Sequence, residues 1–232
     1  MPEGVSVAES TPSALLGQLN DVERKHAPER LFVAGDAAVL DSGPRVALVG
    51  SRRASPAGLN HARALAGFLV EHGVVVVSGL AEGIDTAAHE AALAAGGKTI
   101  AVLGTPLDQV YPASNRQLQE RLMREYLVLS QFPPGERVRK WNFPMRNRTM
   151  ALISHVTIIV EAGESSGSLH QGWEALRLGR PLFILEGVAE NRSLAWPAKM
   201  REYGAIVLSP AHPEEVIEVL PTSGSRVIDL AL

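Results

Sequence analysis

The stretch VALVGSRRASPAG (residues 46–58) places two adjacent arginines in a glycine turn that follows a short apolar run. The apolar run is typical of a buried strand, and Ser55 followed by Pro56 supplies the N-cap and first-turn proline of a helix. The N-terminus of such a helix presents free N–H groups to anions. A dinucleotide-binding turn would carry its second glycine where Arg52 and Arg53 stand. The pair therefore predicts an anionic ligand and leaves its identity open.

The turns after the second, third and fifth expected strands read SGLAEGID (78–85), GTPLDQVYPASN (104–115) and EAGESSGSLHQG (161–172). Glycines and hydroxyls recur in them, and both are found in phosphate cradles. A glycine at a single strand-to-helix turn is often only turn chemistry. Because the carboxyl ends of parallel strands meet at one edge of a sheet, these turns should converge there. The pattern predicts a phosphate-binding site at that edge.

The stretch RVRKWNFPMRNR (137–148) is basic and contains no acidic residue; its cations are Arg137, Arg139, Lys140, Arg146 and Arg148. Trp141 and Phe143 stand among these charges. Cations that follow phosphates, together with aromatic faces that accept bases, are the two ingredients of single-strand binding. The alternative is that the two aromatic residues only fix a loop to the core while the arginines stay in water. The expected position at the same sheet edge as Arg52 favours binding.

Short β-branched runs alternate with alanine- and leucine-rich stretches along the chain. Strands are expected near Val46–Val49, Val74–Ser78, Thr99–Leu103, Leu127–Ser130, Val156–Val160, Leu182–Leu185 and Ile206–Leu208. Helices are expected near 56–72, 83–95, 115–125, 167–178 and 195–203. Strands that are nearly continuous in apolar residues are covered on both faces. The pattern predicts an α/β fold of the extended Rossmann-like type, a doubly wound, mostly parallel sheet with helices on both faces.

We expect one nucleotide- or DNA-binding domain over residues 15–220, with 15–44 as a lead-in at the sheet edge. Residues 1–14 are expected to be loose, and the tail 221–232 to be mobile or to dock on a neighbour. The chain has 232 residues, of which 46% are hydrophobic, so a sizeable core can form. The net charge is −3, so a polyanion must be met by a local patch.

The composition also excludes several classes of function. There is no cysteine, which excludes disulfides, thiolate metal sites and a cysteine nucleophile. The start of the chain lacks the basic and apolar regions of a signal peptide. No apolar run approaches the roughly 18 residues that a membrane span needs. We therefore expect a cytoplasmic protein with no membrane partner.

Six ordered motifs carry a resemblance to a known family: VALVGSRRASPAG, SGLAEGIDTAAH, VLGTPLDQVYPASN, SQFPPG, NFPMRNRTMALIS and VEAGESSGSL…GRPLFILEG. In this order and spacing they resemble the Rossmann-like core of the DNA-processing protein A family (DprA, also called Smf), over about Leu31 to Gly187. The resemblance implies sequence-independent binding of single-stranded DNA in natural transformation. It also implies a homodimer and the loading of a RecA-type recombinase, with no enzymatic activity and no cofactor.

The resemblance further implies roles for particular residues. Arg52 or Arg53 would grip a backbone phosphate, with Lys140 beside them and Phe143 stacked on a base. The pocket behind them would be shaped by Gly50, Ser51, Ser78, Gly79, Ser166, Gly167 and Ser168. The remaining expected DNA-contacting residues are Gly83, Arg146, Asn147 and Arg148. The sequence departs from the family at Gln131, where members usually have glutamate, and it drifts after Gly187.

Two alternatives keep the pocket but change its ligand. Phosphoribohydrolases of the lonely-guy type, in the same superfamily, cleave nucleoside monophosphates with a glutamate at a helix N-terminus. Here Gln171 stands where that glutamate is expected, and Glu174 lies one helical turn further on. Because glutamine cannot act as a general base, a nucleotide-sensing pocket without catalysis is the better of the two alternatives.

Two weaker patterns suggest other chemistry. GESSG (163–167) fits the G-x-S-x-G elbow around a nucleophilic Ser165. Its downstream acid and histidine would have to be Glu186 or Glu190 with His212, a poor set. Asp85 and His89 lie one helical turn apart, but no third metal ligand of matching spacing is apparent. We expect Asp85 to cap its helix, His89 to bond a neighbouring loop, and no metal to bind.

Overall fold

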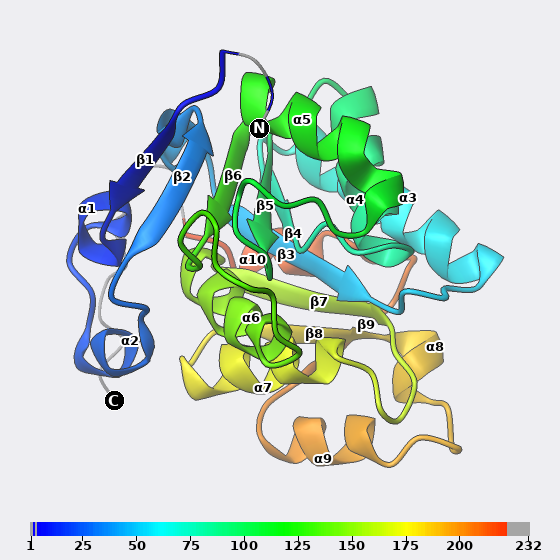
Figure 1. Cartoon of the computed structure of the whole chain (residues 1–232). Coiled ribbons are helices and arrows are strands. Elements are labelled where there is room, and N and C mark those ends of the chain that lie inside the picture. The colour runs from blue at the N-terminus through cyan, green and yellow to red at the C-terminus, as the bar shows by residue number, and fades with distance from the viewer. Residues whose placement is uncertain (1, 3, 222–232) are drawn as a thin grey trace.

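The computed structural model describes residues 2 and 4–221, which form one nine-stranded sheet (Figure 1). The strands are β1 (Val7–Ser10), β2 (Leu31–Gly35), β3 (Arg45–Gly50), β4 (Val75–Ser78), β5 (Thr99–Leu103), β6 (Leu127–Ser130), β7 (Val156–Glu161), β8 (Leu182–Leu185) and β9 (Ile206–Leu208). Their order across the sheet is β1-β2-β6-β5-β4-β3-β7-β8-β9. β2 pairs antiparallel with β1 and β6, and every pairing from β6 to β9 is parallel. The predicted doubly wound, mostly parallel α/β fold is confirmed.

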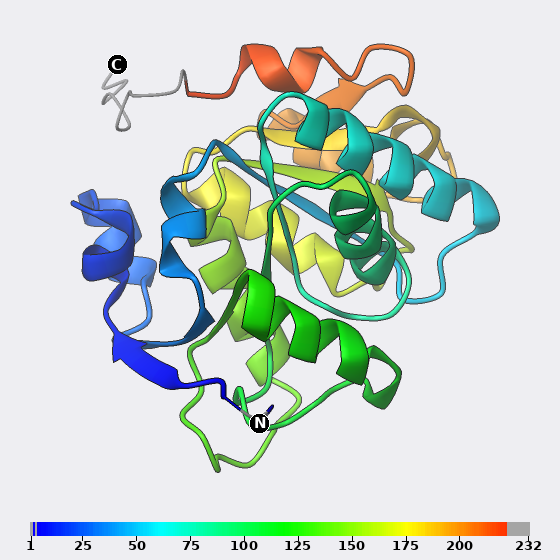
Figure 2. The ribbon, with the colours of Figure 1, turned by 90° about the horizontal axis from the view of Figure 1, so that it is seen from above.

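Helices cover both faces of the sheet (Figure 1). One face carries α3 (Pro56–Glu71), α4 (Ile84–Ala94), α5 (Arg116–Glu125) and α10 (Glu215–Glu218). The other carries α1 (Pro12–Leu16), α6 (Asn142–Ile153), α7 (Ser168–Arg177), α8 (Glu186–Ala189) and α9 (Trp196–Glu202). The remaining helices are α2 (Asp21–His26) and the 3₁₀ turns η1 (Ala37–Asp41) and η2 (Ala113–Asn115). Seen from above, α3 (cyan) and α4 (teal) lie side by side (Figure 2).

Alternation along the strands explains why each face has its own core. In β3, Val46 and Leu48 pack on the α3–α4 face, whereas Ala47 and Val49 pack on the α6–α7 face. All four side chains are buried. The near-continuous apolar strands expected from the sequence therefore result from coverage on both sides.

The expected lead-in contributes strand β2 to the sheet, and two further differences concern the edge of the sheet and the basic stretch. Residues 1–14 were expected to be loose, but β1 pairs with β2 from Val7 opposite Ala34 to Ser10 opposite Leu31. The short edge strand is half exposed, so its side chains show no buried pattern. The second difference is α6, which contains most of the basic stretch expected as a loop. The expected tail lies outside the described residues from 222 onward.

The order in which successive strands are added to the sheet reverses between the parallel neighbours β3 and β7, at the centre of the sheet. From β3 the chain moves through β4 and β5 to β6, and from β7 it moves the other way to β8 and β9. The loops after β3 and β7 therefore diverge from adjacent strands and leave a crevice at their carboxyl ends. No helix in the described part of the chain is both long and apolar enough to cross a membrane.

Candidate functional site

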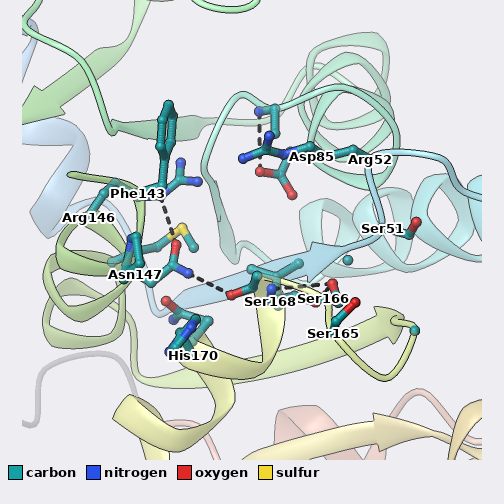
Figure 3. Close-up of a pocket in the computed structure, with 18 of the residues that line it drawn as sticks. Ser51, Arg52, Asp85, Phe143, Arg146, Asn147, Ser165, Ser166, Ser168 and His170 are labelled. Carbon is teal, nitrogen blue, oxygen red and sulfur yellow. Dashed lines mark hydrogen bonds between the residues drawn. The ribbon is translucent and has the colours of Figure 1, made fainter. Parts of the chain in front are cut away.

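A pocket of about 500 Å³ lies at this crevice (Figure 3). The loop after β3 supplies one wall, the loop between β7 and α7 a second, and α6 a third. Ten of the expected site residues line it: Gly50, Ser51, Arg52, Arg53, Phe143, Arg146, Asn147, Ser166, Gly167 and Ser168. The structure thus brings together segments that are more than a hundred residues apart in the sequence.

Arg52 and Arg53 are exposed at the mouth of the pocket. The Arg52 guanidinium lies 5.4 Å from the centre of the Phe143 ring, within cation–π range. The Phe143 ring is half-buried and tilted against Tyr111, with 5.5 Å between the ring centres. A Cβ at position 104 would collide with Phe143, so Gly104 allows the ring to rest on the end of β5.

Arg146 forms the floor of the pocket and is only 6% exposed. Its Nη1 donates to the carbonyl oxygens of Gly79, at 2.5 Å, and Val102, at 2.8 Å. Its Nε donates to Oδ1 of Asn147 at 2.8 Å. Arg146 therefore ties α6 to the ends of β4 and β5. Gly79 is needed for this approach, because a Cβ there would overlap the guanidinium.

Asp85 is the buried carboxylate of the same site. Its Oδ2 accepts hydrogen bonds from the backbone N–H groups of Gly79, at 3.2 Å, and Ala81, at 3.3 Å. Burial raises the pKa of Asp85, and the charge of Arg146 with these N–H groups opposes the rise. Burial is also the main cause that lowers the pKa of Arg146, and the Arg52 charge lowers it further. Two cations that repel one another across a pocket favour an anion between them.

Glu161, at the end of β7, is a residue of this region that sequence reasoning missed. Its carboxylate accepts from the Ser55 N–H, at 3.0 and 3.2 Å, and from the Ser55 hydroxyl. Gly58 in the first turn of α3 leaves room for this carboxylate, which a Cβ would displace. Glu161 thus occupies the helix N-terminus where a Rossmann turn would bind a pyrophosphate. This arrangement agrees with the sequence, in which Arg52 and Arg53 stand where a dinucleotide-binding turn would have its second glycine.

The β7–α7 loop forms the hydroxyl-bearing wall. Ser166 and Ser168 share a hydrogen bond of 2.7 Å between their hydroxyls, and Asn147 Nδ2 donates to the Gly167 carbonyl at 2.9 Å. Figure 3 shows Phe143, Arg146 and Asn147 of α6 facing these serines across the pocket. Asn147 therefore fixes the distance between two of the walls.

Five expected site residues do not line the pocket: Ser78, Gly79, Gly83, Lys140 and Arg148. Ser78 is fully buried, and its hydroxyl donates to the Leu48 carbonyl at 2.7 Å. Gly83 has φ +79°, and a Cβ there would collide with the Ser51 carbonyl. These two residues hold the strand ends together. Lys140 is exposed just before α6, and Arg148 faces the opposite side of that helix.

The expected roles of Asp85 and His89 are wrong in detail. α4 begins after Gly83 without a side-chain cap, and Asp85 instead holds the preceding loop. His89 Nδ1 bonds the Thr99 hydroxyl of β5 at 2.7 Å, not a loop. Burial lowers the pKa of His89 to about 3.

The geometry also bears on the rival chemistries. Gln171 lines the pocket but is fully buried, whereas Glu174 lies outside it and pairs at 3.5 Å with both Arg148 and Arg177. Ser165 lines the pocket, but Glu186, Glu190 and His212 do not. His212 instead pairs with Glu214 at 3.0 Å. The residues that each hydrolytic mechanism needs are therefore not assembled around this pocket.

Comparison with known proteins identifies relatives of this chain in sequence and in fold. The sequence model of the family described as DNA recombination-mediator protein A matches residues 9–221. DNA processing protein DprA of Streptococcus pneumoniae is 47% identical over 161 residues, which cover 69% of this chain and 56% of that protein. DprA of Bacillus subtilis is 36% identical over 194 residues, 84% of this chain and 65% of that protein. This chain thus spans less than two thirds of the length of either relative.

A solved structure of DNA processing protein A from Helicobacter pylori, described for its single-stranded DNA binding mode, superposes with a TM-score of 0.78. The two are 29% identical, and the match covers 94% of this chain and 98% of that one. The family match includes every strand from β2 to β9 and every wall of the arginine-lined pocket. On fold, sequence and extent of the match together, the chain belongs to the DNA recombination-mediator protein A family.

Proposed function

We propose that this protein binds single-stranded DNA without sequence preference through the pocket between β3, β7 and α6. One observation supports this most: Arg52, Arg53 and Arg146 converge on a pocket in which Asp85 is the single carboxylate among the described lining residues. Guanidinium groups bind phosphate bidentately, and Phe143 adds an aromatic face beside them. The relative from Helicobacter pylori that is described for binding single-stranded DNA has the same fold.

The roles follow from exposure. Arg52 and Arg53 are exposed and can reach a backbone phosphate, and Lys140, exposed just before α6, would add a further cation. Arg146 is held by two carbonyls and adds a fixed positive charge behind them. Ser51, Ser166 and Ser168 line the same pocket, and their hydroxyls would bond the phosphate or a base edge. The proposal needs no cofactor, no metal and no catalytic group.

The proposal extends to partners by family membership. We infer a homodimer that passes the strand to a RecA-type recombinase. Among the described residues, β9 is the strand at one edge of the sheet, and its residue Ile206 is 40% exposed. A second copy of the chain could therefore pack against this edge. Sedimentation of the full chain tests the dimer, and strand-exchange assays with a recombinase test the transfer.

We expect labelled single-stranded oligonucleotides to bind more tightly than duplexes of the same length, with affinity that falls steeply as salt rises. Arg52→Ala and Lys140→Ala should each weaken binding equally for all base sequences. Each should also make the salt slope shallower by about one unit, because one fewer counterion is released. Fluorescence anisotropy across a salt series measures both quantities.

The matched control is Arg116→Ala, which removes an exposed arginine of α5 that pairs with Glu120 at 4.0 Å and lines neither pocket. It should leave the salt slope unchanged. Equal affinity for duplex, or an equal loss in the Arg116 and Arg52 variants, would contradict a specific single-strand site.

A second candidate is a mononucleotide sensor, favoured by the 500 Å³ volume and the hydroxyl-rich wall. Nucleoside monophosphates should then compete with the oligonucleotide at the pocket. Because Gln171 is buried and cannot act as a base, incubation should release no free base above background. Chromatography measures the release, and turnover abolished by Glu174→Ala would show that the protein is a hydrolase.

A further inference from the structure

A second pocket, of about 460 Å³, lies on the other side of α6. It is lined by residues 26–30 at the end of α2, by residues 131–133 and 136 after β6, and by α6. Helical spacing divides the basic stretch between the two pockets. Phe143, Arg146 and Asn147 face the first pocket, while Trp141, Asn142, Met145 and Arg148 face the second.

Asn142 is the first reason to expect a ligand there. The residue is 1% exposed, yet its Nδ2 has no hydrogen-bond acceptor among the described residues. Buried amide donors are nearly always satisfied, so this unpaired donor needs an acceptor. The Nδ2 atom is itself shielded from solvent, so an acceptor in the cavity would reach it after a small rotation of the Asn142 side chain. Carbonyl oxygens and ring nitrogens of nucleobases are such acceptors.

Trp141 is the second reason. Trp141 is 56% exposed at the rim of the second pocket. The Arg139 guanidinium lies 5.0 Å from the centre of its ring. An exposed indole beside a cation offers a stacking face and a phosphate contact together, which is how single strands are held without sequence preference.

The charges assign the phosphate and the base to different parts of this pocket. Arg148 is half-exposed on one side and can meet a phosphate, while its Nε lies 3.5 Å from Glu174. Glu29 and Glu136 also line the pocket and repel phosphate, whereas Arg30, next to Glu29 in the lining, pairs with Glu9 at 3.5 Å. Carboxylates do accept hydrogen bonds from base N–H groups, including N3–H of thymine, so the base would point inward and the phosphate toward Arg148.

We propose that this second pocket, formed around Trp141, Asn142 and Arg148, binds a further nucleotide of the same strand. The strand then passes over the N-terminal end of α6 and occupies both sides of the helix. Residues 137–148 between the two pockets contain no acidic side chain, so no carboxylate of that segment repels the phosphates between them. The proposal rests on the proposed function, since the first pocket must hold the strand.

The test compares thymidine oligonucleotides of roughly 4 and roughly 16 nucleotides, a range that spans known site sizes. Trp141→Ala should lower the affinity for the long oligonucleotide about tenfold and leave the affinity for the short one unchanged, because the short one fills only the first pocket. Trp141→Phe keeps an aromatic face and should restore most of the affinity. Thermal melting of each variant confirms that it is folded.

Arg148→Ala and Arg177→Ala form a matched pair, because both arginines lie 3.5 Å from Glu174 and are exposed to a similar extent. Only Arg148 lines the second pocket. Arg148→Ala should make the salt slope for the long oligonucleotide shallower by about one unit, and Arg177→Ala should not.

Two results would overturn the second subsite. The first is that Trp141→Ala changes the affinity for both oligonucleotide lengths equally or for neither. The second is that the Arg148→Ala and Arg177→Ala variants have the same salt slope. A protein-docking role for this pocket would give unchanged binding of both oligonucleotides. Failure of the proposed function is a different result, in which the unaltered protein binds neither length or Arg52→Ala has no effect.

Discussion

Arg146→Leu is expected to lower the free energy of unfolding by about 3–5 kcal/mol, the usual cost when loss of a cation leaves a buried carboxylate uncompensated. The variant deletes the bonds to the Gly79 and Val102 carbonyls and leaves Asp85 buried without its cation. Urea denaturation at neutral pH measures the loss. Arg148→Leu is the control, two residues along α6, because Arg148 is half-exposed and its partner Glu174 keeps a second cation, Arg177, at 3.5 Å. It should cost no more than about 1 kcal/mol.

The same variant should show a characteristic dependence on pH. The pKa of Asp85 is already raised by burial, and loss of Arg146 removes the main charge that opposes the rise. A folded-state pKa above the unfolded value means that the folded form binds the proton more tightly, so this group stabilises the fold at low pH and the benefit is lost as pH rises through the folded pKa. The deficit of Arg146→Leu relative to the unaltered protein should therefore narrow as pH falls from neutrality toward the ordinary pKa of Asp85.

Adding Asp85→Asn to Arg146→Leu isolates the cause. Asparagine cannot ionise, so the deficit of the double variant should no longer narrow with falling pH. If the single and double variants have the same pH dependence, Arg146 acts by packing and by its carbonyl bonds, and the charge of Asp85 is irrelevant.

The regular part of the fold could be predicted because its signal is local. All seven expected strands are present within one residue of their expected bounds, and Ser55 caps α3 as its sequence indicates. Helix α6 was missed because its polar residues do not mark a solvent face. Arg146, Asn147 and Thr149 are buried, so the helical period of apolar residues disappears. Pro144 also suggests a break, although in the first turn it removes no helical hydrogen bond.

The site was predictable as a convergence of turns but not as a set of contacts. The carboxyl-end rule placed Arg52 and the serines near Ser166 at one edge, which the structure shows. The partners of Arg146 are backbone carbonyls of β5 and of the turn after β4, and carbonyl positions leave no trace in residue type. Glu161 meets Ser55 across 106 residues only because β3 and β7 are neighbours, a pairing that strand patterns alone do not specify. Contacts that depend on which strands are neighbours, such as the one between Glu161 and Ser55, therefore could not be predicted from the sequence.

Phe143→Ala is expected to lower the affinity for single-stranded DNA by roughly ten- to a hundredfold, because base stacking on an aromatic face contributes about 1–3 kcal/mol. The counterion count does not change, so the salt slope should stay parallel to that of the unaltered protein, unlike the slope of Arg52→Ala. The ring is half-buried and rests on Gly104 beside Tyr111, so truncation also tests its packing. Anisotropy and thermal melting must therefore be measured together.

Phe143→Leu separates the two roles of this ring. Leucine retains apolar contact with the end of β5 but offers no aromatic face, so the melting temperature should be nearly preserved while affinity falls as in Phe143→Ala. If the Ala variant instead melts much earlier while its folded fraction binds normally, the ring only anchors α6 against Gly104. Arg52 and Arg53 would then hold the strand by its phosphates, and base stacking would contribute nothing to the affinity.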